Sequence, residues 1–543
     1  MKKNLFKTKA LGIAFVAAAL ARAACSEDKT AAEEDVITPP QEEVETPAEP
    51  TLYTAPLATV ASSSDRVKMA GAKTKADETG KPGSLRLFAT IENPSKQSDF
   101  ANFEREDRYL SATSVYYDQA TGTYYATYHM QGNNYNTTQT VETAGLIETF
   151  KLDGSGVPQL ETIYRSADPA KLDFDFNHLY FDQIPNPGYP DFVGEYNADN
   201  FSGSRIIVGG HTTEPVKEGT GTNTAAMIAR LNLDDPQHPS IDYSVVYTGA
   251  KLLDKNGKSL GNEDAGDVNC FVRKYNHYYL ATRKGIAVLK ASQDHLFEPE
   301  LDGNGQIYFL KTPGSAKYMS QPTVTSYLDI LFLNNDTPED GLSKETASPA
   351  TVAEIALDTR DGKDLVYTFP NVADFSWALS TPNSIRKDKF ASVSPVDGKN
   401  MLVTSSYNTS AIYACLGKNG LYVFDDTYGY KHDKILKFSD TEDGSRPVNG
   451  LFAEDWDSVN GRHATDGFIY VANGACLTIL DALTLETVAH YSAFEEGKEI
   501  SANFVHVVRT DEATNGSAPD RIITVAYGQA GVKVFKFVPP TRF

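Results

Sequence analysis

The stretch Gly467–Asp481, with the sequence GFIYVANGACLTILD, most constrains the fold, because versions of it recur along the chain. Two runs rich in β-branched and aromatic residues, Phe468–Val471 and Cys476–Leu480, flank a tight Asn-Gly turn. A run before the stretch, Asn449–Phe452, and one after it, Glu486–Tyr491, complete a unit of four. Short runs of this composition, bounded by Gly, Asn and Asp, are typical of strands. The unit is therefore predicted to be a four-stranded antiparallel meander.

Seven copies of this unit are recognised by their second and third strands. The pairs are Thr123–Ala126 with Gly145–Ile147, Arg205–Val208 with Ala226–Ala229, Tyr278–Ala281 with Gly285–Val288, Leu328–Leu331 with Val352–Ile355, Met401–Thr404 with Gly420–Val423, Phe468–Val471 with Cys476–Leu480, and Ile522–Val525 with Gly531–Val534. Repetition of one supersecondary unit marks architectures that stack that unit. Because radial repetition of four-stranded sheets gives a β-propeller, the chain is predicted to be all-β, with seven blades of four antiparallel strands.

The two ends of the repeat region favour closure into a ring. The last repeat ends at Phe537 with three strands, whereas Leu85–Ile91 precedes the first repeat as an unassigned strand. We expect this N-terminal strand to complete the last blade and close the ring. Within the unit described first, Tyr470–Asn473 and Ile479–Asp481 resemble the YVTN-type propeller repeat. That resemblance implies a fold and no particular activity.

Residues 1–24 have the features of a signal peptide. Lys2, Lys3, Lys7 and Lys9 form a basic start, and Leu11–Ala21 is apolar but too short to span a bilayer. The following Ala23-Ala24-Cys25 resembles a bacterial lipobox, which implies lipidation of Cys25, although Arg22 departs from the usual pattern. The alternative is a signal peptidase cut after Ala23.

Residues 25–80 are rich in Pro, Glu, Ala, Thr and Ser, and this composition predicts an acidic, disordered tether before a propeller domain at 81–543. Ser26–Lys29 resembles the acidic export signal of Bacteroidota surface lipoproteins. The resemblance implies an outer-membrane or cell-surface location, with the lipid anchor as the contact with the membrane. The net charge of -22 argues against nucleic acid as a partner.

The predicted turns between second and third strands would gather on one face of a propeller, where loops vary while the blades stay rigid. This candidate binding face holds Asn133, Tyr135, His211, Arg283, Asn334, Tyr407, Asn473, Tyr527 and Gln529. A face rich in Tyr and Asn suits a glycan or a protein surface. The alternative is that these residue types simply serve tight turns.

Signatures of catalysis are scarce in the sequence. It contains no GxSxG elbow, HExxH or P-loop, so no catalytic residue and no cofactor is assigned. His129 and His211 both end a second strand, but they are expected to be turn residues and no metal site is assigned. Cys270, Cys415 and Cys476 lie on predicted strands and are expected to be buried apolar filler.

These features together predict a non-catalytic surface lipoprotein for binding, adhesion and assembly. The Bacteroidota resemblance implies other surface or fimbrial proteins as partners, and trimming of the N-terminal segment by an arginine-specific protease. Arg66, in the predicted tether, is the candidate cleavage site. One alternative is capture of a glycan or an iron carrier beside an outer-membrane transporter. Another is a propeller enzyme acting on glycans, with carboxylates from separate blades.

Overall fold

The computed structural model describes residues 52–70, 83–103, 108–132, 145–167, 174–185, 201–213, 224–245, 268–274 and 277–282, and later 467–482, 484–493, 500–514 and 518–540. Elsewhere between 252 and 454 it describes shorter pieces, most of them strands. The described part is all-β, as predicted, with three short 3-10 helices, η1 (Ser64–Arg66), η2 (Pro94–Lys96) and η3 (Ser98–Phe103).

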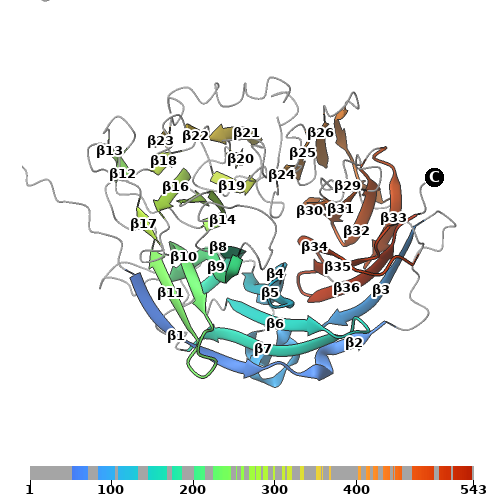
Figure 1. The fold of residues 1–543 in the computed structure, drawn as a ribbon, viewed down its shortest axis with the longest axis horizontal. Coiled ribbons are helices and arrows are strands. Elements are labelled where there is room, and N and C mark those ends of the chain that lie inside the picture. The colour runs from blue at the N-terminus through green and yellow to red at the C-terminus, as the bar shows by residue number, and fades with distance from the viewer. Residues whose placement is uncertain are drawn as a thin grey trace, which may run out of the picture. The chain divides into compact units, whose positions relative to one another are not determined.

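The strands form antiparallel sheets in chain order, named here sheets I to VII (Figure 1). Sheet I is β4 (Arg108–Asp118), β5 (Thr123–Gly132), β6 (Leu146–Leu152) and β7 (Pro158–Ser166), and sheet II is β8 (Phe174–Pro185), β9 (Phe201–Thr213), β10 (Thr224–Asn232) and β11 (Ser240–Val245). Sheet III is β14 (Val268–Lys274), β15 (His277–Thr282), β16 (Gly285–Lys290), β17 (Glu298–Pro299) and β18 (Phe309–Lys311), and sheet IV is β19 (Ser315–Ser320), β20 (Ile330–Asn335) and β21 (Ala350–Ile355).

Three more main sheets follow, and three two-stranded sheets are formed by β12 (Leu252–Leu253) with β13 (Ser259–Gly261), β22 (Leu357–Asp358) with β23 (Val366–Tyr367), and β28 (Ser439–Asp440) with β29 (Gly444–Ser445). Sheet V is β24 (Leu402–Thr404), β25 (Ala411–Cys415), β26 (Leu421–Asp425) and β27 (His432–Leu436), and sheet VI is β30 (Val448–Ala453), β31 (Phe468–Asn473), β32 (Cys476–Asp481) and β33 (Thr487–Ser492). Sheet VII is β34 (Phe504–Arg509), β35 (Arg521–Ala526) and β36 (Val532–Val538), extended by β3 (Ser84–Ile91) and β2 (Val67–Met69).

The predicted pairing of second and third strands is confirmed in every repeat except the fifth. In the fifth repeat the pairing of Met401–Thr404 with Gly420–Val423 is wrong, because β25 lies between β24 and β26 and pairs with both. The run Ala411–Cys415 is short, and its role as a strand depends on burial of Tyr413 and Cys415, which are 4% and 0% exposed.

The predicted partner of the N-terminal strand Leu85–Ile91 is confirmed. Strand β3 pairs antiparallel with β36, placing Leu85 opposite Phe537 and Ile91 opposite Val532. Leu87 and Phe535 are also opposite each other, and both are buried. Residues more than 400 positions apart in the chain therefore share one sheet.

The predicted tether is wrong over residues 52–70, and its other residues lie outside the described part. Leu52–Ala61 forms strand β1, which pairs with β7 on one side and β11 on the other, and Val67–Met69 forms β2. Composition favoured disorder, but the outer edges of neighbouring sheets offer unpaired backbone groups that an extended segment can satisfy. Through β1, sheets I and II form one nine-stranded sheet that folds back until its end strands, β4 and β8, are in contact.

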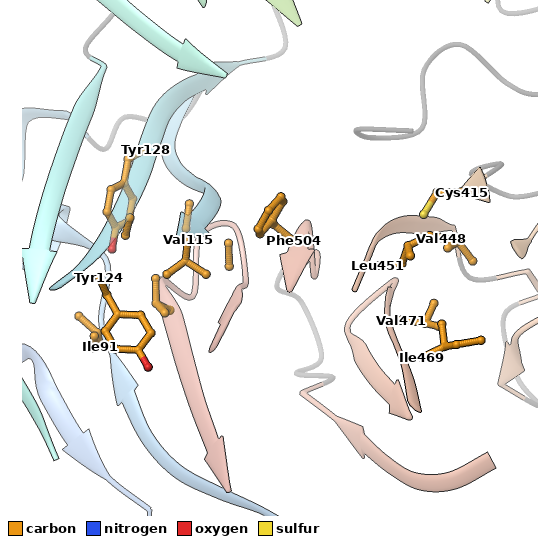
Figure 2. Packing of buried hydrophobic residues seen from close by; sticks show 14 of the residues in the cluster. Ile91, Val115, Tyr124, Tyr128, Cys415, Val448, Leu451, Ile469, Val471 and Phe504 are labelled. Atoms are coloured by element: carbon orange, nitrogen blue, oxygen red, sulfur yellow. The ribbon is translucent and has the colours of Figure 1, made fainter. Parts of the chain in front are cut away.

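Consecutive sheets pack against one another mainly through their first strands. Strand β8 contacts β5, β14 contacts β8, β19 contacts β14, β24 contacts β19, β30 contacts β25 and β34 contacts β30. Strand β34 also contacts β4, so sheet VII meets sheet I. One buried apolar cluster accordingly contains residues of sheets I, V, VI and VII, among them Tyr128, Cys415, Leu451 and Phe504 (Figure 2).

Candidate functional site

Most of the predicted binding face cannot be placed. Asn133, Tyr135, Arg283 and Tyr407 lie outside the described residues, and Asn334 is described only as a backbone position in β20, between Ala316 and Thr351. His211, Asn473 and Tyr527 are 6%, 2% and 0% exposed, whereas Gln529 is half-buried. The burial of these three side chains disagrees with their predicted role as an open contact surface.

Asn473 and Tyr527 are held by contacts within their own sheets. The Asn473 side-chain oxygen accepts a hydrogen bond from the Thr478 hydroxyl at 3.0 Å. The amide of Tyr527 donates to the Gly531 carbonyl at 2.8 Å, which closes the β35–β36 turn. The Lys533 ammonium lies over the Tyr527 ring, 5.6 Å from its centroid. Both residues therefore stabilise the turns that were expected to present them to a partner.

Asparagines at the start of the first strands connect one sheet to the next. Asn177 of sheet II donates from its side-chain amide to the Val268 carbonyl of sheet III at 3.3 Å. Asn449 of sheet VI donates to the Ala502 carbonyl at 3.1 Å, just before sheet VII. Asn503, directly before β34, donates to the Ala112 carbonyl of sheet I at 2.9 Å. The same side-chain group thus makes the same contact at three sheet interfaces.

A β-bulge explains how Asn177 and Asn449 reach the neighbouring sheet. The pairing of first and second strands shifts register at Asn177, Asn269 and Asn449, and at Thr113 in sheet I. A bulged residue is left out of the ladder and its side chain is re-aimed. Asn503 instead lies directly before the first strand of sheet VII. The acceptor carbonyl in each contact belongs to the residue before the equivalent position of the next sheet: Val268 precedes Asn269, Ala502 precedes Asn503, and Ala112 precedes Thr113.

Five residues after the asparagine, two first strands carry a carboxylate that forms ion pairs with the next sheet. Asp182 of sheet II pairs with Arg273 of sheet III and accepts a hydrogen bond from Tyr278 at 2.8 Å. Burial, and then the Asp182 charge, raises the pKa of Tyr278 well above its usual value. The phenol therefore stays protonated and donates to the carboxylate.

Glu454 of sheet VI makes the equivalent contact with sheet VII. Its oxygens accept from Arg521 at 2.7 and 3.1 Å and from the Phe468 amide at 3.2 Å. The Arg521 side chain is fully buried, and its guanidinium also stacks over the Phe468 ring at 5.5 Å. Buried charges are stable only when paired and hydrogen-bonded, so this contact fixes the position of sheet VII against sheet VI.

Arg66, the predicted cleavage site, lies inside the fold. It is 2% exposed, pairs with the fully buried Glu148 and donates to the Glu92 carbonyl at 2.6 Å. Tyr128 donates to the same Glu148 carboxylate at 3.1 Å. The prediction of an accessible arginine in a flexible segment is therefore wrong, because the segment is ordered by this buried ion pair.

The first strands of sheets I, II and III also bring together Tyr116, His178 and Cys270. The Tyr116 hydroxyl and His178 Nδ1 are hydrogen-bonded at 2.8 Å, and Cys270 Sγ lies 3.8 Å from His178 Nε2. Cys270, Cys415 and Cys476 are all buried and none forms a disulfide, which confirms their predicted burial. Among the described residues no group of three or more His, Cys, Asp or Glu could hold a metal ion. Within the same residues no helix is long and apolar enough to cross a membrane.

The asparagines and carboxylates were missed in the sequence, although they leave a short signal. Asn177 to Asp182 reads NHLYFD and Asn449 to Glu454 reads NGLFAE, which place an amide and a carboxylate at the same spacing in two first strands. The repeats are recognised by their second and third strands, whereas this shared spacing of an amide and a carboxylate lies at the first strands.

The geometry defines an all-β protein of consecutive antiparallel sheets, in which buried polar side chains join neighbouring sheets. No protein-family model matches the chain, and no curated protein matches it. Among solved structures, the computationally designed Ika8 protein aligns with 79% of this chain and 97% of its own, at 10% identity and a TM-score of 0.33. A TM-score this low does not define the fold of the chain.

Proposed function

We propose that the chain forms a seven-bladed β-propeller in which β3 closes the ring. The pairing of β3 with β36, the contact of each sheet with the next, and the contact of sheet VII with sheet I support this architecture. The recurrent bulge at the start of the first strand, with its amide donating to the next sheet, adds a repeated geometry of the kind that stacked units share.

The propeller acts as a non-catalytic binding and assembly module of a cell-surface lipoprotein anchored through Cys25. The observation that carries this proposal is the uneven length of the connections between second and third strands. Residues 133–145, 214–223 and 336–349 connect these strands in sheets I, II and IV, whereas 474–475 suffices in sheet VI. Long connections carried by a rigid scaffold are where proteins place their binding residues.

The partners proposed for this module are other surface proteins, including subunits of a fimbria. The connection at 133–145 contains Asn133, Tyr135 and further Asn and Thr residues. Tyrosine is favoured at protein interfaces, because it offers a large contact area together with a hydroxyl group. Arg283 belongs to the corresponding connection of sheet III and Asn334 to the end of β20 in sheet IV, whereas Tyr407 falls between β24 and β25, the first and second strands of sheet V, and so leaves the proposed face.

A second candidate function is capture of a glycan or an iron carrier for an outer-membrane transporter. The sequence NNYNTT at 133–138 favours it, because side-chain amides, hydroxyls and an aromatic ring are the groups that bind a polyhydroxylated or aromatic small ligand. The two candidates share the same segment and differ in the size of the partner.

The test replaces residues 133–144 by a short Gly-Ser connection in the full-length protein on intact cells. Cross-linking should then lose a surface-protein adduct that forms with the wild type, and the matched replacement of the exposed residues 234–238 in the β10–β11 turn should keep it. A thermal shift with a glycan panel or a ferric catecholate complex, lost in the same variant, would instead support capture. Binding unchanged by the replacement would contradict both candidate functions.

Membrane fractionation of Cys25→Ala separately tests the lipid anchor. Retention of this variant in the membrane fraction would contradict anchoring through Cys25.

A further inference from the structure

Strand β1 crosses from one sheet to another along their outer edges. Its first half, Leu52–Pro56, pairs with β11 of sheet II, and its second half, Leu57–Ala61, pairs with β7 of sheet I (Figure 1). At the crossover the Leu57 amide donates to the Pro239 carbonyl at 2.9 Å, and the Ala167 amide donates to the Pro56 carbonyl at 3.1 Å. Backbone hydrogen bonds therefore tie this one strand to both sheets.

The segment after β1 continues onto a third sheet. Arg66 is buried against Glu148 of sheet I, and β2 pairs with β3 of sheet VII. The Glu92 amide donates to the Arg66 carbonyl at 2.9 Å, which fixes the backbone as well as the side chain. Residues 52–69, named here the outer strap, thus bind sheets II, I and VII in that order.

Apolar packing holds the outer strap against both of the sheets that β1 joins. Ala55 and Leu57 are 6% and 8% exposed and belong to one cluster with Ile147 of sheet I and Ile241 of sheet II. Detaching the strap therefore removes backbone pairing and apolar contact from sheets I and II together.

On the inner side, sheet I differs from sheets II and VI at the bulge position from which those sheets bond to a neighbour. Thr113 occupies the bulge where those sheets have asparagine, and its hydroxyl bonds to Thr127 of its own sheet at 2.7 Å. The asparagines of sheets II and VI donate to the next sheet from this position, whereas the Thr113 hydroxyl is engaged within sheet I.

We propose that the outer strap is the clamp of the interface between sheets I and II, in place of the inner asparagine that bonds sheet II to III and sheet VI to VII. Inside this interface Tyr116 is hydrogen-bonded to His178 and the Tyr125 ring packs edge to face against Phe181, and the strap adds backbone pairing to both sheets from outside. Release of the strap opens this interface in preference to the others. A mechanical force applied to the chain before Leu52 would therefore detach the strap and separate sheets I and II before other sheets separate.

Hydrogen exchange of the full-length protein tests the inference with Leu57→Pro. Proline removes the amide that donates to Pro239 and the buried leucine side chain, at the point where β1 changes partner. We expect exchange to rise about tenfold or more in the β4 and β8 amides and to stay unchanged in β30–β32. Thr487→Pro, in the outer strand of sheet VI, is the matched control and should leave β4 and β8 protected. A rise confined to the strap, or an equal rise in all sheets, would overturn the proposal.

Two further variants extend the test, and the first keeps it decisive if Leu57→Pro folds poorly. Cysteines at Ala58 and Arg165, which lie opposite each other in β1 and β7, lock the strap when oxidised, and β8 amides should then exchange more slowly than in the reduced protein. Thr113→Asn, combined with Leu57→Pro, puts an amide at the bulge facing sheet II. Exchange of the β4 and β8 amides should then be about tenfold slower than in Leu57→Pro alone. No change in either variant would contradict a clamp that substitutes for the inner one.

Discussion

Arg66 and Glu148 form an ion pair that is closed to solvent on both sides, with side chains 2% and 0% exposed. The pair joins a residue near the N-terminus of the described chain to the third strand of sheet I, 82 positions later. Tyr128 and the Glu92 carbonyl occupy further hydrogen-bonding positions around it. A segment that composition alone would leave disordered is therefore an integral part of the fold.

Replacing Arg66 by Met should lower the free energy of unfolding by about 3–5 kcal/mol, because Glu148 would remain buried without its counter-charge. Urea denaturation measures the change. The control is Lys68→Ala, which removes the pair with Glu92 at 3.6 Å, whose side chains are 58% and 39% exposed, and should alter stability by less than about 1 kcal/mol. Trypsin should cleave after Arg66 slowly in the wild type and faster in Glu148→Gln. Fast cleavage of the native wild type would contradict the burial.

Asn503→Ala should destabilise the protein by about 1–2 kcal/mol, because the Ala112 carbonyl loses its side-chain donor at a sheet interface. Asn503→Asp should cost more at neutral pH, since a carboxylate cannot donate to a carbonyl. Chemical denaturation compares both with Gln159→Ala, an exposed residue that bonds within its own turn. Equal stability of the Ala variant and the control would show that the contact with Ala112 is dispensable.

Arg521→Met should cost about 3–5 kcal/mol by removing the fully buried counter-charge of Glu454 between sheets VI and VII and leaving only the partly exposed Arg509, at 3.4 Å. The double variant Glu454→Gln with Arg521→Met should recover part of that loss, since both charges are then gone. A double-mutant cycle from thermal unfolding gives the coupling energy. Additive effects of the two changes would contradict a direct interaction.

Gly531→Ala should destabilise the closing pair of β36 and β3 by about 2–3 kcal/mol. Gly531 has φ +80°, and a Cβ there would lie 2.1 Å from the Ile91 carbonyl oxygen. Gly154→Ala is the control, because nothing lies within 4 Å of its added Cβ. Hydrogen exchange in β3 should increase in the first variant only, and an unaltered β3 would argue against the tight turn.

His506 should make the protein less stable as the pH falls. Burial lowers its pKa from 6.5 to about 4 in the folded state, so the unfolded chain binds more protons between these values. Stability from this group is fully present above pH 6.5 and is lost progressively toward pH 4. His506→Phe keeps the aromatic contact with Phe452 and should lose about 1–2 kcal/mol less stability between pH 7 and 4.5. The control His238→Gln, at an exposed residue, should show the same dependence of stability on pH as the wild type. If His506→Phe also showed that dependence, the lowered pKa of His506 would be contradicted.

The positions of most strands could be predicted because they depend on local alternation. Runs such as Phe468–Val471 and Ile522–Val525 carry β-branched and aromatic residues between Gly, Asn and Asp, and neighbouring runs pair across short turns. Even the partner of Leu85–Ile91 followed from a strand missing in the last repeat. The exception, Ala411–Cys415, is a short run whose strand character depends on its neighbours.

The candidate site was harder to predict, because exposure is not a local property. His211, Asn473 and Tyr527 sit near turns in the sequence, yet tertiary packing buries all three. Asn177, Asn449 and Asn503 cannot be told from other polar residues in the sequence. Their role depends on a carbonyl of another sheet that tertiary packing places opposite each side-chain amide.

Local sequence patterns were enough to predict most of the repeated strands, their turns and the strand that joins β36, because hydrophobic alternation and turn chemistry act over a few residues. Packing between distant segments was needed to show that residues 52–69 belong to the fold, that Arg66 is buried and which sheets the asparagines and carboxylates connect. These outcomes depend on backbone edges and charges brought together from distant parts of the chain, whose free energy appears only when the sheets pack.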